Sequence, residues 1–339
     1  MSEKYLIFGA TGSIGSSLAE QLVNTGNSVH LVGRNESETK NISEKLGCAF
    51  TIADVLQDGF VDKVKNDISD IKGIAYCVGS IDLKPLRMVS EQDFNKCMKL
   101  NLYSAVEVIK GYQDSLKKNK GSVVLFSTVA AQRGFTNNAI IASTKAAVEG
   151  LTVSLAAEFA PNIRVNCIAP SLTNSKIAEP MLKNKALADG IAKAHPLKRL
   201  GEGKDSASLA KFLISDDSSW VTGQVIAVDG GRSKLSYKIM YIAMNRFKIV
   251  LGKEKDFENV WKNRDTHLDG VKGFKNFNLI KGDTNKDYSL YSSHSTWESK
   301  EDFINWTKSE AFRLAHKNAA QHRDLYLGPP DFEGFEVVF

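Results

Sequence analysis

A glycine-rich turn directly after the first apolar run is the feature that most restricts the fold of this chain. The run Lys4–Phe8 leads into Gly9-Ala-Thr-Gly-Ser-Ile-Gly15, and a helical pattern covers Ser13–Thr25. Glycines at this spacing let the backbone approach a pyrophosphate, which then lies on the N-terminus of the following helix. The pattern also occurs in ordinary tight turns, but its place after the first strand of a strand–helix–strand unit favours a dinucleotide site.

Short apolar runs alternate with longer amphipathic stretches up to about residue 232. The further runs with the length of strands are Ser28–Gly33, Ala49–Ile52, Gly73–Cys77, Ser122–Ser127, Ile163–Cys167 and Gln224–Val228. Helical patterns lie between them, for example over Glu91–Leu116 and Asn138–Ala160. This alternation predicts an α/β Rossmann fold with a doubly wound parallel sheet, in a first domain that spans residues 1–234.

The residue pattern changes after about residue 237, and three of the four Trp and four of the six His lie beyond it. A capping-box sequence at Ser299 opens a helix. The other predicted elements are a helix at Lys255–Leu268 and strands at Ile239–Val250, Phe274–Ile280, Tyr288–Trp297 and Phe335–Phe339. The order βαββαβ predicts an α+β ferredoxin-like domain over residues 238–339. Such a sheet has one bare face, so we expect a homo-oligomer, either a dimer or a tetramer.

Composition excludes several classes of protein. The 44 basic and 39 acidic residues give a net charge of +5 without a basic run, so nucleic-acid binding is not expected. No apolar run approaches the roughly 20 residues that span a bilayer, and the first residues lack the pattern of a signal peptide. The four cysteines lie far apart, which favours reduced thiols. They are Cys48, Cys77, Cys97 and Cys167. We therefore expect a cytoplasmic protein with no membrane partner.

The end of the second strand indicates which dinucleotide is bound. An acidic residue there would hold the ribose 2′-hydroxyl, whereas this chain has Arg34-Asn35. An arginine can instead neutralise a 2′-phosphate, which favours NADP(H) over NAD. The alternative is that Arg34 is a solvated residue in a loop.

Residues 1–232 resemble the short-chain dehydrogenase/reductase family over their whole length. The turn at Gly9–Gly15 matches, and Cys77-Val78-Gly79 stands in place of the usual Asn-Ala-Gly. The other matching pieces are Asp54-Val55, Asn101, Ser127-Thr128, Lys145, Arg164-Val165-Asn166, Ala169-Pro170, Val221–Gln224 and Asp229–Gly231.

The resemblance implies which residues form the site. Asp54 would contact the adenine, Lys145 the nicotinamide ribose, and Pro170–Thr173 the carboxamide. The implied cofactor-binding residues are Gly9, Thr11, Ser13, Ile14, Gly15, Arg34, Asn35, Asp54, Val55, Gly79, Lys145, Pro170, Leu172 and Thr173. The implied catalytic residues of this domain are Asn101, Thr128 and Lys145.

One position departs from the family pattern. The family uses a Tyr four residues before the Lys as general acid, and this chain has Ile141 there, with no Tyr between Tyr112 and Tyr237. Ser127 or Thr128 could take the role of the substrate-orienting Ser. Isoleucine cannot deliver a proton, so we expect the domain, if active, to reduce a conjugated acceptor such as a bilin or a flavin.

The second domain resembles the haem-degrading monooxygenases of the antibiotic-biosynthesis-monooxygenase superfamily, which are dimeric α/β barrels. The stretches that carry this resemblance are Met244–Phe247, Trp261–Gly273, Trp297–His316 and Tyr326–Phe339. It implies haem as substrate or ligand, and Asn245, Trp306 and His316 as catalytic residues. His316 would be the ligand of the metal.

The chemistry of these three side chains agrees with that role. A neutral imidazole is a good proximal ligand of haem iron, an amide can donate a hydrogen bond to dioxygen, and an indole can distort the macrocycle. Trp306 and His316 are ten residues apart, about 1000° of helix rotation, so one straight helix would not place both on one face. We therefore expect a break near Ser309. Taken alone, such a His is usually solvated and such a Trp usually belongs to a core.

Three functions remain open from the sequence. The first is a haem-degrading monooxygenase fused to an NADP(H)-binding domain, which would need an external reductase or a flavin because hydride donors transfer electron pairs and haem iron accepts single electrons. The second is a carbonyl reductase in which the barrel only promotes dimerisation. The third is a sensor of NADPH or haem without catalysis. Within the barrel superfamily, a cofactor-free quinol or polyketide monooxygenase is the alternative.

Overall fold

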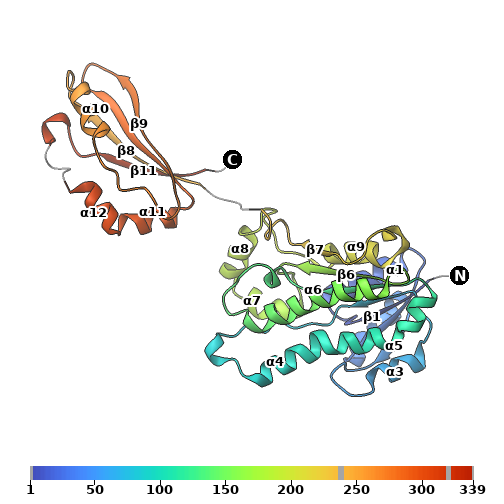
Figure 1. The fold of residues 1–339 in the computed structure, drawn as a ribbon. Helices are drawn as coiled ribbons and strands as arrows, with labels where there is room; N and C mark the ends of the chain where they lie inside the picture. The colour runs from blue at the N-terminus through green and yellow to red at the C-terminus, as the bar shows by residue number, and fades with distance from the viewer. Residues whose placement is uncertain (1–2, 236–239, 318–321, 338–339) are drawn as a thin grey trace. The chain divides into compact units, whose positions relative to one another are not determined.

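The computed structural model describes residues 3–235, 240–317 and 322–337. The chain divides into two compact units, unit 1 over residues 1–236 and unit 2 over residues 237–339 (Figure 1). Each unit has its own core and is described by itself.

Unit 1 contains a seven-stranded sheet in which every neighbouring pair of strands is parallel, in the order β3-β2-β1-β4-β5-β6-β7. The doubly wound parallel sheet predicted from the sequence is therefore confirmed. Its strands are β1 Lys4–Phe8, β2 Ser28–Gly33, β3 Ala49–Ile52, β4 Gly73–Tyr76, β5 Ser122–Phe126, β6 Arg164–Pro170 and β7 Val225–Val228.

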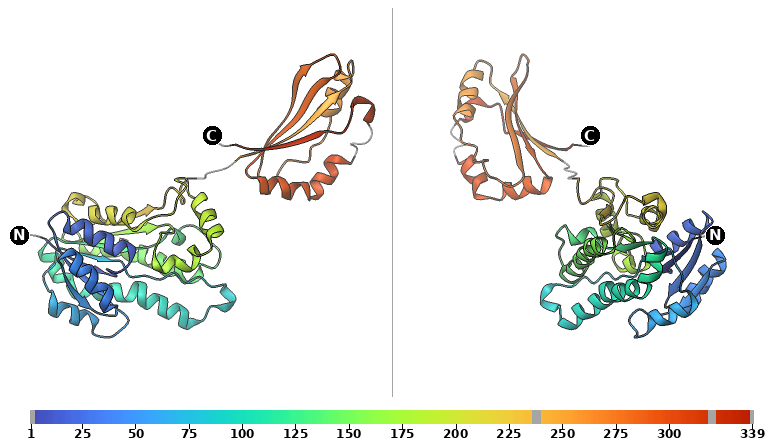
Figure 2. Two further views of the ribbon diagram at one scale, coloured as in Figure 1. Left: turned by 180° about the vertical axis from the view of Figure 1, so that it is seen from behind. Right: turned by 45° about the vertical axis from the view of Figure 1, so that its right-hand side comes forward.

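Helices cover both faces of this sheet (Figures 1 and 2). On one face, Val64, Val108 and Val148 belong to one buried cluster; on the other, Leu18 and Leu213 belong to a second. The helices are α1 Ser13–Val23, α2 Glu36–Leu46, α3 Phe60–Asp67, α4 Glu91–Met98, α5 Ser104–Lys118, α6 Ala139–Phe159, α7 Glu179–Leu182, α8 Lys185–Lys193 and α9 Gly203–Ile214. A π-helical turn at Lys99–Tyr103 separates α4 from α5, so the long helix predicted over Glu91–Leu116 is interrupted.

Helix α6 is long and apolar enough to cross a membrane by length and composition alone, which the sequence analysis did not expect. Its place in the fold explains this composition. Val148 and Ala156 pack in the core of unit 1, and Ile140 and Ile141 are also buried. The helix also buries Lys145, whose side chain turns back towards the sheet.

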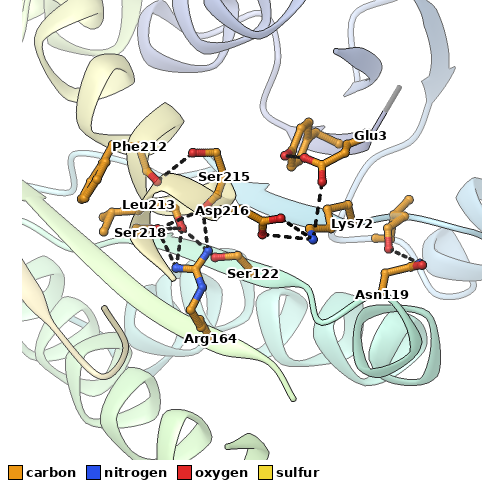
Figure 3. A network of polar contacts seen from close by, with 12 residues as sticks. Glu3, Lys72, Asn119, Ser122, Arg164, Phe212, Leu213, Ser215, Asp216 and Ser218 are labelled. Carbon is orange, nitrogen blue, oxygen red and sulfur yellow. Dashed lines mark hydrogen bonds and ion pairs between the residues drawn. The ribbon is translucent and has the colours of Figure 1, made fainter. Parts of the chain in front are cut away.

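Arg164 connects the amino-terminal edge of the sheet to the end of α9 (Figure 3). Its guanidinium donates to the carbonyl oxygens of Leu213 at 3.0 Å and Ser215 at 2.8 Å. A cation is favourable there because the C-terminal carbonyls of a helix carry partial negative charge. Lys72, directly before β4, pairs with Asp216 at 3.0 Å in the same network. The polar contacts therefore hold the sheet and α9 together at the edge where the strands begin.

Unit 2 contains a four-stranded antiparallel sheet in the order β11-β8-β10-β9. Its strands are β8 Tyr241–Ile249, β9 Phe274–Thr284, β10 Ser289–Trp297 and β11 Asp331–Glu336, and its helices are α10 Glu254–Lys262, α11 Lys300–Thr307 and α12 Glu310–His316. The element order confirms the ferredoxin-like prediction. The three helices lie on one face of the sheet (Figure 2).

Several predicted boundaries in unit 2 are wrong. Helix α10 ends at Lys262 rather than Leu268 because the chain turns soon after it. In this turn the Asp265 carboxylate accepts from the backbone N–H of His267, whose φ is positive at 48°. Leu268 follows directly and is buried in the core. The last strand begins at Asp331 rather than Phe335, because it pairs with β8 from Arg246 back to Tyr241. Residues 239, 338 and 339 of the predicted strands lie outside the described residues.

Gly203, the first residue of α9, allows this helix to approach α1 closely. A Cβ at this position would lie 2.1 Å from the carbonyl oxygen of Ser13, far inside van der Waals contact. We therefore expect Gly203→Ala to lower the free energy of unfolding by about 1–3 kcal/mol, in the range of overpacked cores. Urea unfolding followed by circular dichroism measures the change.

Gly190→Ala in α8 is the matched control, because nothing lies within 4 Å of a Cβ there. Removing a glycine from an open helix position should stabilise the chain by about 0.5–1 kcal/mol. Equal effects of the two substitutions would contradict the close approach of α1 and α9.

Candidate functional site

A pocket of about 630 Å³ lies at the carboxyl ends of the parallel strands in unit 1. Ligands bind at this edge of open α/β sheets, because the loops that follow the strands gather there. The predicted site residues that line the pocket are Gly9, Thr11, Ser13, Ile14, Gly15, Arg34, Asp54, Val55, Gly79, Thr128, Lys145, Pro170, Leu172 and Thr173. Ser127 and Ile141 line it as well.

The turn between β1 and α1 is built to hold an anion. Gly9 has a φ of +76°, and its carbonyl accepts from the Gly12 N–H at 3.0 Å. Gly12 is the N-cap of α1 and supplies no side chain to cap the helix. The first N–H groups of α1 therefore face the pocket end of the helix without intrahelical partners, which suits the pyrophosphate of a dinucleotide.

The residues after β2 divide between the pocket and helix α2. Arg34 lines the pocket and is exposed, and within the described residues no carboxylate lies within ion-pair distance of it. Asn35 was predicted to bind the cofactor, but it does not line the pocket. Its side chain instead caps α2 by accepting from the Glu38 N–H at 3.2 Å. Of these two residues, therefore, only Arg34 lines the pocket.

Lys145 places a buried cation beside the pocket. Its side chain is 6% exposed, and its Nζ donates to the carbonyl oxygen of Phe126, at the end of β5, at 2.8 Å. Burial lowers the pKa of this ammonium to about 8, although the nearby Cys167, Cys97 and Cys77 thiols act in the opposite direction. The group can thus change its charge close to neutral pH.

Asn101 lies behind Gly79, beside Lys145. A Cβ at position 79 would lie 3.2 Å from Asn101 Oδ1 and 3.4 Å from Lys145 Nζ, so both groups approach the same glycine. The Asn101 amide nitrogen donates to the Cys97 carbonyl at 2.9 Å, whereas its buried Oδ1 has no hydrogen-bond partner in the described chain. A buried oxygen without a partner is costly unless a ligand or water meets it.

The hydroxyls after β5 point in different directions. Ser127 donates to Glu149 Oε1 at 2.7 Å, towards α6. The Thr128 hydroxyl donates a long bond of 3.4 Å to the Pro170 carbonyl and accepts from the Ala130 N–H at 3.3 Å, and the residue lines the pocket without a bond to another side chain. Ile141 is 5% exposed and packs beside Cys97 where it borders the pocket. Thr128 is therefore better placed than Ser127 to orient a substrate.

A pair of side chains that the sequence did not predict holds the loop after β6. His195 is 1% exposed; its Nδ1 bonds the carbonyl oxygen of Ile191 at 2.7 Å, and its Nε2 lies 2.8 Å from Ser171 Oγ. A carbonyl only accepts, so Nδ1 donates and Nε2 accepts from Ser171. Burial lowers the pKa of this imidazole, which favours its neutral form. A single His before a proline gave no sequence signal of this pairing.

In unit 2, the helical segment is interrupted near Ser309, as the sequence predicted. Helix α11 ends at Thr307, and Ser309 caps α12 by accepting from the Phe312 N–H at 3.3 Å. The break brings the Trp306 and His316 rings to a centroid distance of 6.2 Å. The Trp306 indole N–H is buried and has no partner within the described residues.

His316 has one nitrogen engaged and one available. Its Nδ1 donates to the Phe312 carbonyl at 2.8 Å, so Nε2 carries the lone pair. Burial lowers the pKa of the imidazole, and Arg264 acts in the same direction. Among the described residues no cluster of three or more His, Cys, Asp or Glu could hold a metal, so a metal here would rely on this imidazole and a non-protein ligand set.

Asn245 occupies the middle of β8, between two apolar clusters. Strand alternation puts it on the same face as Ala243 and Phe247, which belong to different clusters beneath the helices. Its cross-strand neighbour Phe332 stacks on Phe303 of α11 at 5.6 Å. Asn245 therefore lies on the sheet face that the helices cover, and Trp306 and His316 lie on two of those helices.

Comparison with known proteins gives the family of each unit. The model described as enoyl-(acyl carrier protein) reductase matches residues 9–233, about two thirds of the chain. The chain belongs to the short-chain dehydrogenase/reductase family. The antibiotic biosynthesis monooxygenase model matches residues 240–318, so unit 2 is a domain of that superfamily.

Curated relatives and solved structures match the dehydrogenase/reductase unit. A tropinone reductase homologue of Arabidopsis thaliana is 32% identical over 238 residues, which cover 67% of this chain and 90% of the relative. The 3-oxoacyl-[acyl-carrier-protein] reductase of Chlamydia trachomatis is 29% identical, over 67% of this chain and 95% of the relative.

Among solved structures, a short-chain type dehydrogenase/reductase from Mycobacterium ulcerans has a TM-score of 0.65 and 29% identity, covering 69% of this chain and 91% of that one. The protein ElxO with NADP bound has a TM-score of 0.64 and 26% identity, covering 69% of this chain and 100% of that one. The sheet and its cofactor edge are thus those of an oxidoreductase family.

The buried Lys145 of the dehydrogenase/reductase unit should make stability depend on pH. Its pKa is about 8 in the folded chain against an ordinary value of 10.5, so between these pH values only the unfolded chain holds the proton and stability rises with pH. Lys145→Met should therefore be more stable than the native chain at pH 7, by at most about 3 kcal/mol, and the difference should shrink at pH 9.5.

Urea unfolding at the two pH values measures this difference. Lys117→Met removes an exposed lysine from α5 and should show no such pH trend. A difference between the native chain and Lys145→Met that is the same at both pH values would contradict a buried, charged ammonium.

Proposed function

We propose that this protein is a haem-degrading monooxygenase fused to an NADP(H)-binding dehydrogenase/reductase unit that reduces a conjugated acceptor. The observation that carries the haem proposal is the helix break at Ser309, which brings Trp306 and His316 together with Nε2 of the imidazole available. Without this break, a carbonyl reductase with a structural barrel would be the simpler reading.

The residues of unit 2 suit haem as a substrate. Haem iron needs one protein ligand, and His316 offers a neutral imidazole whose orientation is fixed through Nδ1. Haem supplies the iron at which oxygen reacts. The unpartnered Trp306 N–H and the Asn245 amide provide hydrogen-bond donors on the same helix-covered face of the sheet.

Electrons and assembly complete the proposal. Haem turnover takes single electrons, so we propose that an external reductase delivers them.

The bare face of the unit 2 sheet carries Ile242, Met244 and Leu290, which lie on the same side of the sheet by their register. We propose that this face pairs with a second copy of the chain. The location we propose is the cytoplasm, with neither nucleic acid nor membrane as a partner.

Haem binding tests the proposal directly. Hemin added to the purified native chain should give a shifted Soret band, and His316→Ala should lose this shift because the ligand nitrogen is gone. Asn245→Ala should keep the shift but slow its decay with ascorbate and oxygen, because its amide acts on oxygen rather than on haem affinity. Absorbance spectroscopy follows both.

His294→Ala is the matched control, since strand alternation and its register opposite Met244 place this residue on the other face of the sheet. It should bind hemin like the native chain. A native chain without a Soret shift, or an equal loss in both histidine variants, would refute the ligand assignment. A stable complex that does not decay would favour a haem sensor.

The cofactor of unit 1 is proposed to be NADP(H). Arg34 lies at the end of the pocket next to α2 without a carboxylate partner in the described chain, which leaves its charge for a 2′-phosphate. ElxO, a solved neighbour, binds NADP, and a variant of it with one tyrosine changed to phenylalanine has NADPH bound. Lys145 and the Pro170–Thr173 loop would hold the nicotinamide end.

Ile141 sets the kind of acceptor that we propose. Reduction of a ketone needs a proton on oxygen as charge develops, and a positioned acid contributes roughly 10²–10⁴ in rate. The pocket presents an apolar side chain at this position and no Tyr in its lining. A conjugated acceptor spreads the charge over its π-system, so water can supply the proton later.

We therefore expect the native chain to reduce simple ketones slowly, and Ile141→Tyr to raise this rate by about 10²-fold or more, because a phenol would then lie in the pocket near Lys145. Oxidation of NADPH, followed at 340 nm, measures it. Ile141→Phe adds the ring without the hydroxyl and should gain nothing. Fast ketone reduction by the native chain would overturn the argument.

A further inference from the structure

One arginine borders the part of the dehydrogenase/reductase pocket that is lined by apolar side chains. Phe135, Ile177, Met181 and Ile191 line this part together with Arg232. Of the other cations in the lining, Lys176 pairs with Glu38 at 2.9 Å, and Lys145 and Arg34 belong to the cofactor residues. Arg232 is thus a charged group that the proposed cofactor and chemistry do not use.

A second arginine lies beside the first. The guanidinium carbons of Arg133 and Arg232 lie 5.8 Å and 5.2 Å from the centre of the same Phe135 ring. Arg133 donates a hydrogen bond to the backbone carbonyl of Arg232, and Arg232 donates to the Ile191 carbonyl at 3.3 Å. These contacts hold both cations against one aromatic ring, and of the two Arg232 lines the pocket.

Within the described residues, neither arginine makes an ion pair with a carboxylate. Burial and the neighbouring Arg133 both lower the pKa of the Arg232 guanidinium, whereas the Asp229 carboxylate acts in the opposite direction from beyond ion-pair distance. The nearest acid in sequence, Asp229, accepts instead from the Gly231 and Ser233 backbone N–H groups at 2.9 and 2.6 Å. Two like charges held side by side are destabilising unless an anion joins them.

We propose that Arg232, supported by Arg133, binds a carboxylate of the substrate, whose flat body lies against Phe135. A guanidinium matches a carboxylate with two parallel hydrogen bonds, and an aromatic ring favours a planar partner. The substrate class is therefore a conjugated or aromatic carboxylic acid. This inference rests on the proposed function of the pocket, because it assumes that the hydride acceptor binds there.

Binding of a matched pair of probes tests the inference without turnover. The full chain is saturated with NADPH and titrated with 9-anthracenecarboxylate or with 9-anthracenecarboxamide, and probe fluorescence is followed. The native chain should bind the carboxylate at least about tenfold more tightly than the amide, as charge-assisted hydrogen bonds are the stronger kind. Arg232→Gln should abolish this preference, and Arg133→Gln should reduce it several-fold.

Arg87→Gln is the control, because it removes one exposed guanidinium from the same unit, outside the pocket lining. It should keep the preference. Equal binding of the two probes, no binding of the carboxylate at millimolar concentration, or equal losses in Arg87→Gln and Arg232→Gln would overturn the inference. Weaker NADPH binding by Arg232→Gln would assign the arginine to the cofactor instead. A failure of ketone or haem assays would leave these binding results unaffected.

Discussion

All seven strands of unit 1 run in one direction, and this constraint decides where its chemistry can occur. Each strand delivers its following loop to the same edge: Gly9 follows β1, Arg34 follows β2, and Ser127 follows β5. Helix α6 then adds Lys145 and Ile141 from the side. Residues that are more than a hundred positions apart in the chain meet in one pocket because the carboxyl ends of all the parallel strands lie at the same edge of the sheet.

Within that pocket, the buried Lys145 has the largest effect on the electrostatics. A charged group in the interior is stable only when polar groups meet it, and here the Phe126 carbonyl and the neighbouring Asn101 amide lie around it. A positive centre in the same pocket as an apolar Ile141 suits the ligand class that we propose, which accepts a hydride without an immediate proton. The acceptor that we propose follows from this combination, whereas the choice of NADP(H) rests on Arg34.

Much of the fold could be predicted because parallel strands are buried on both faces and stand out as apolar runs. The ferredoxin-like order and the break at Ser309 were predictable too, since caps and turns are local signals. The end of α10 was not, because one bond from Asp265 to the His267 backbone decides it. The pairs Ser171–His195 and Arg133–Arg232 are 24 and 99 residues apart, and only tertiary packing brings them together.

The Arg164 network lies where the strands begin, and the pocket lies where they end. The polar contacts that tie α9 to the sheet are thus physically separate from the groups that touch ligands. An exchange at the pocket edge, such as a substitution of Ile141, changes the groups that meet a ligand but leaves those contacts intact. Because the stabilising contacts and the ligand-binding residues lie at opposite ends of the same strands, the pocket can change its substrate without loss of the contacts that stabilise the fold.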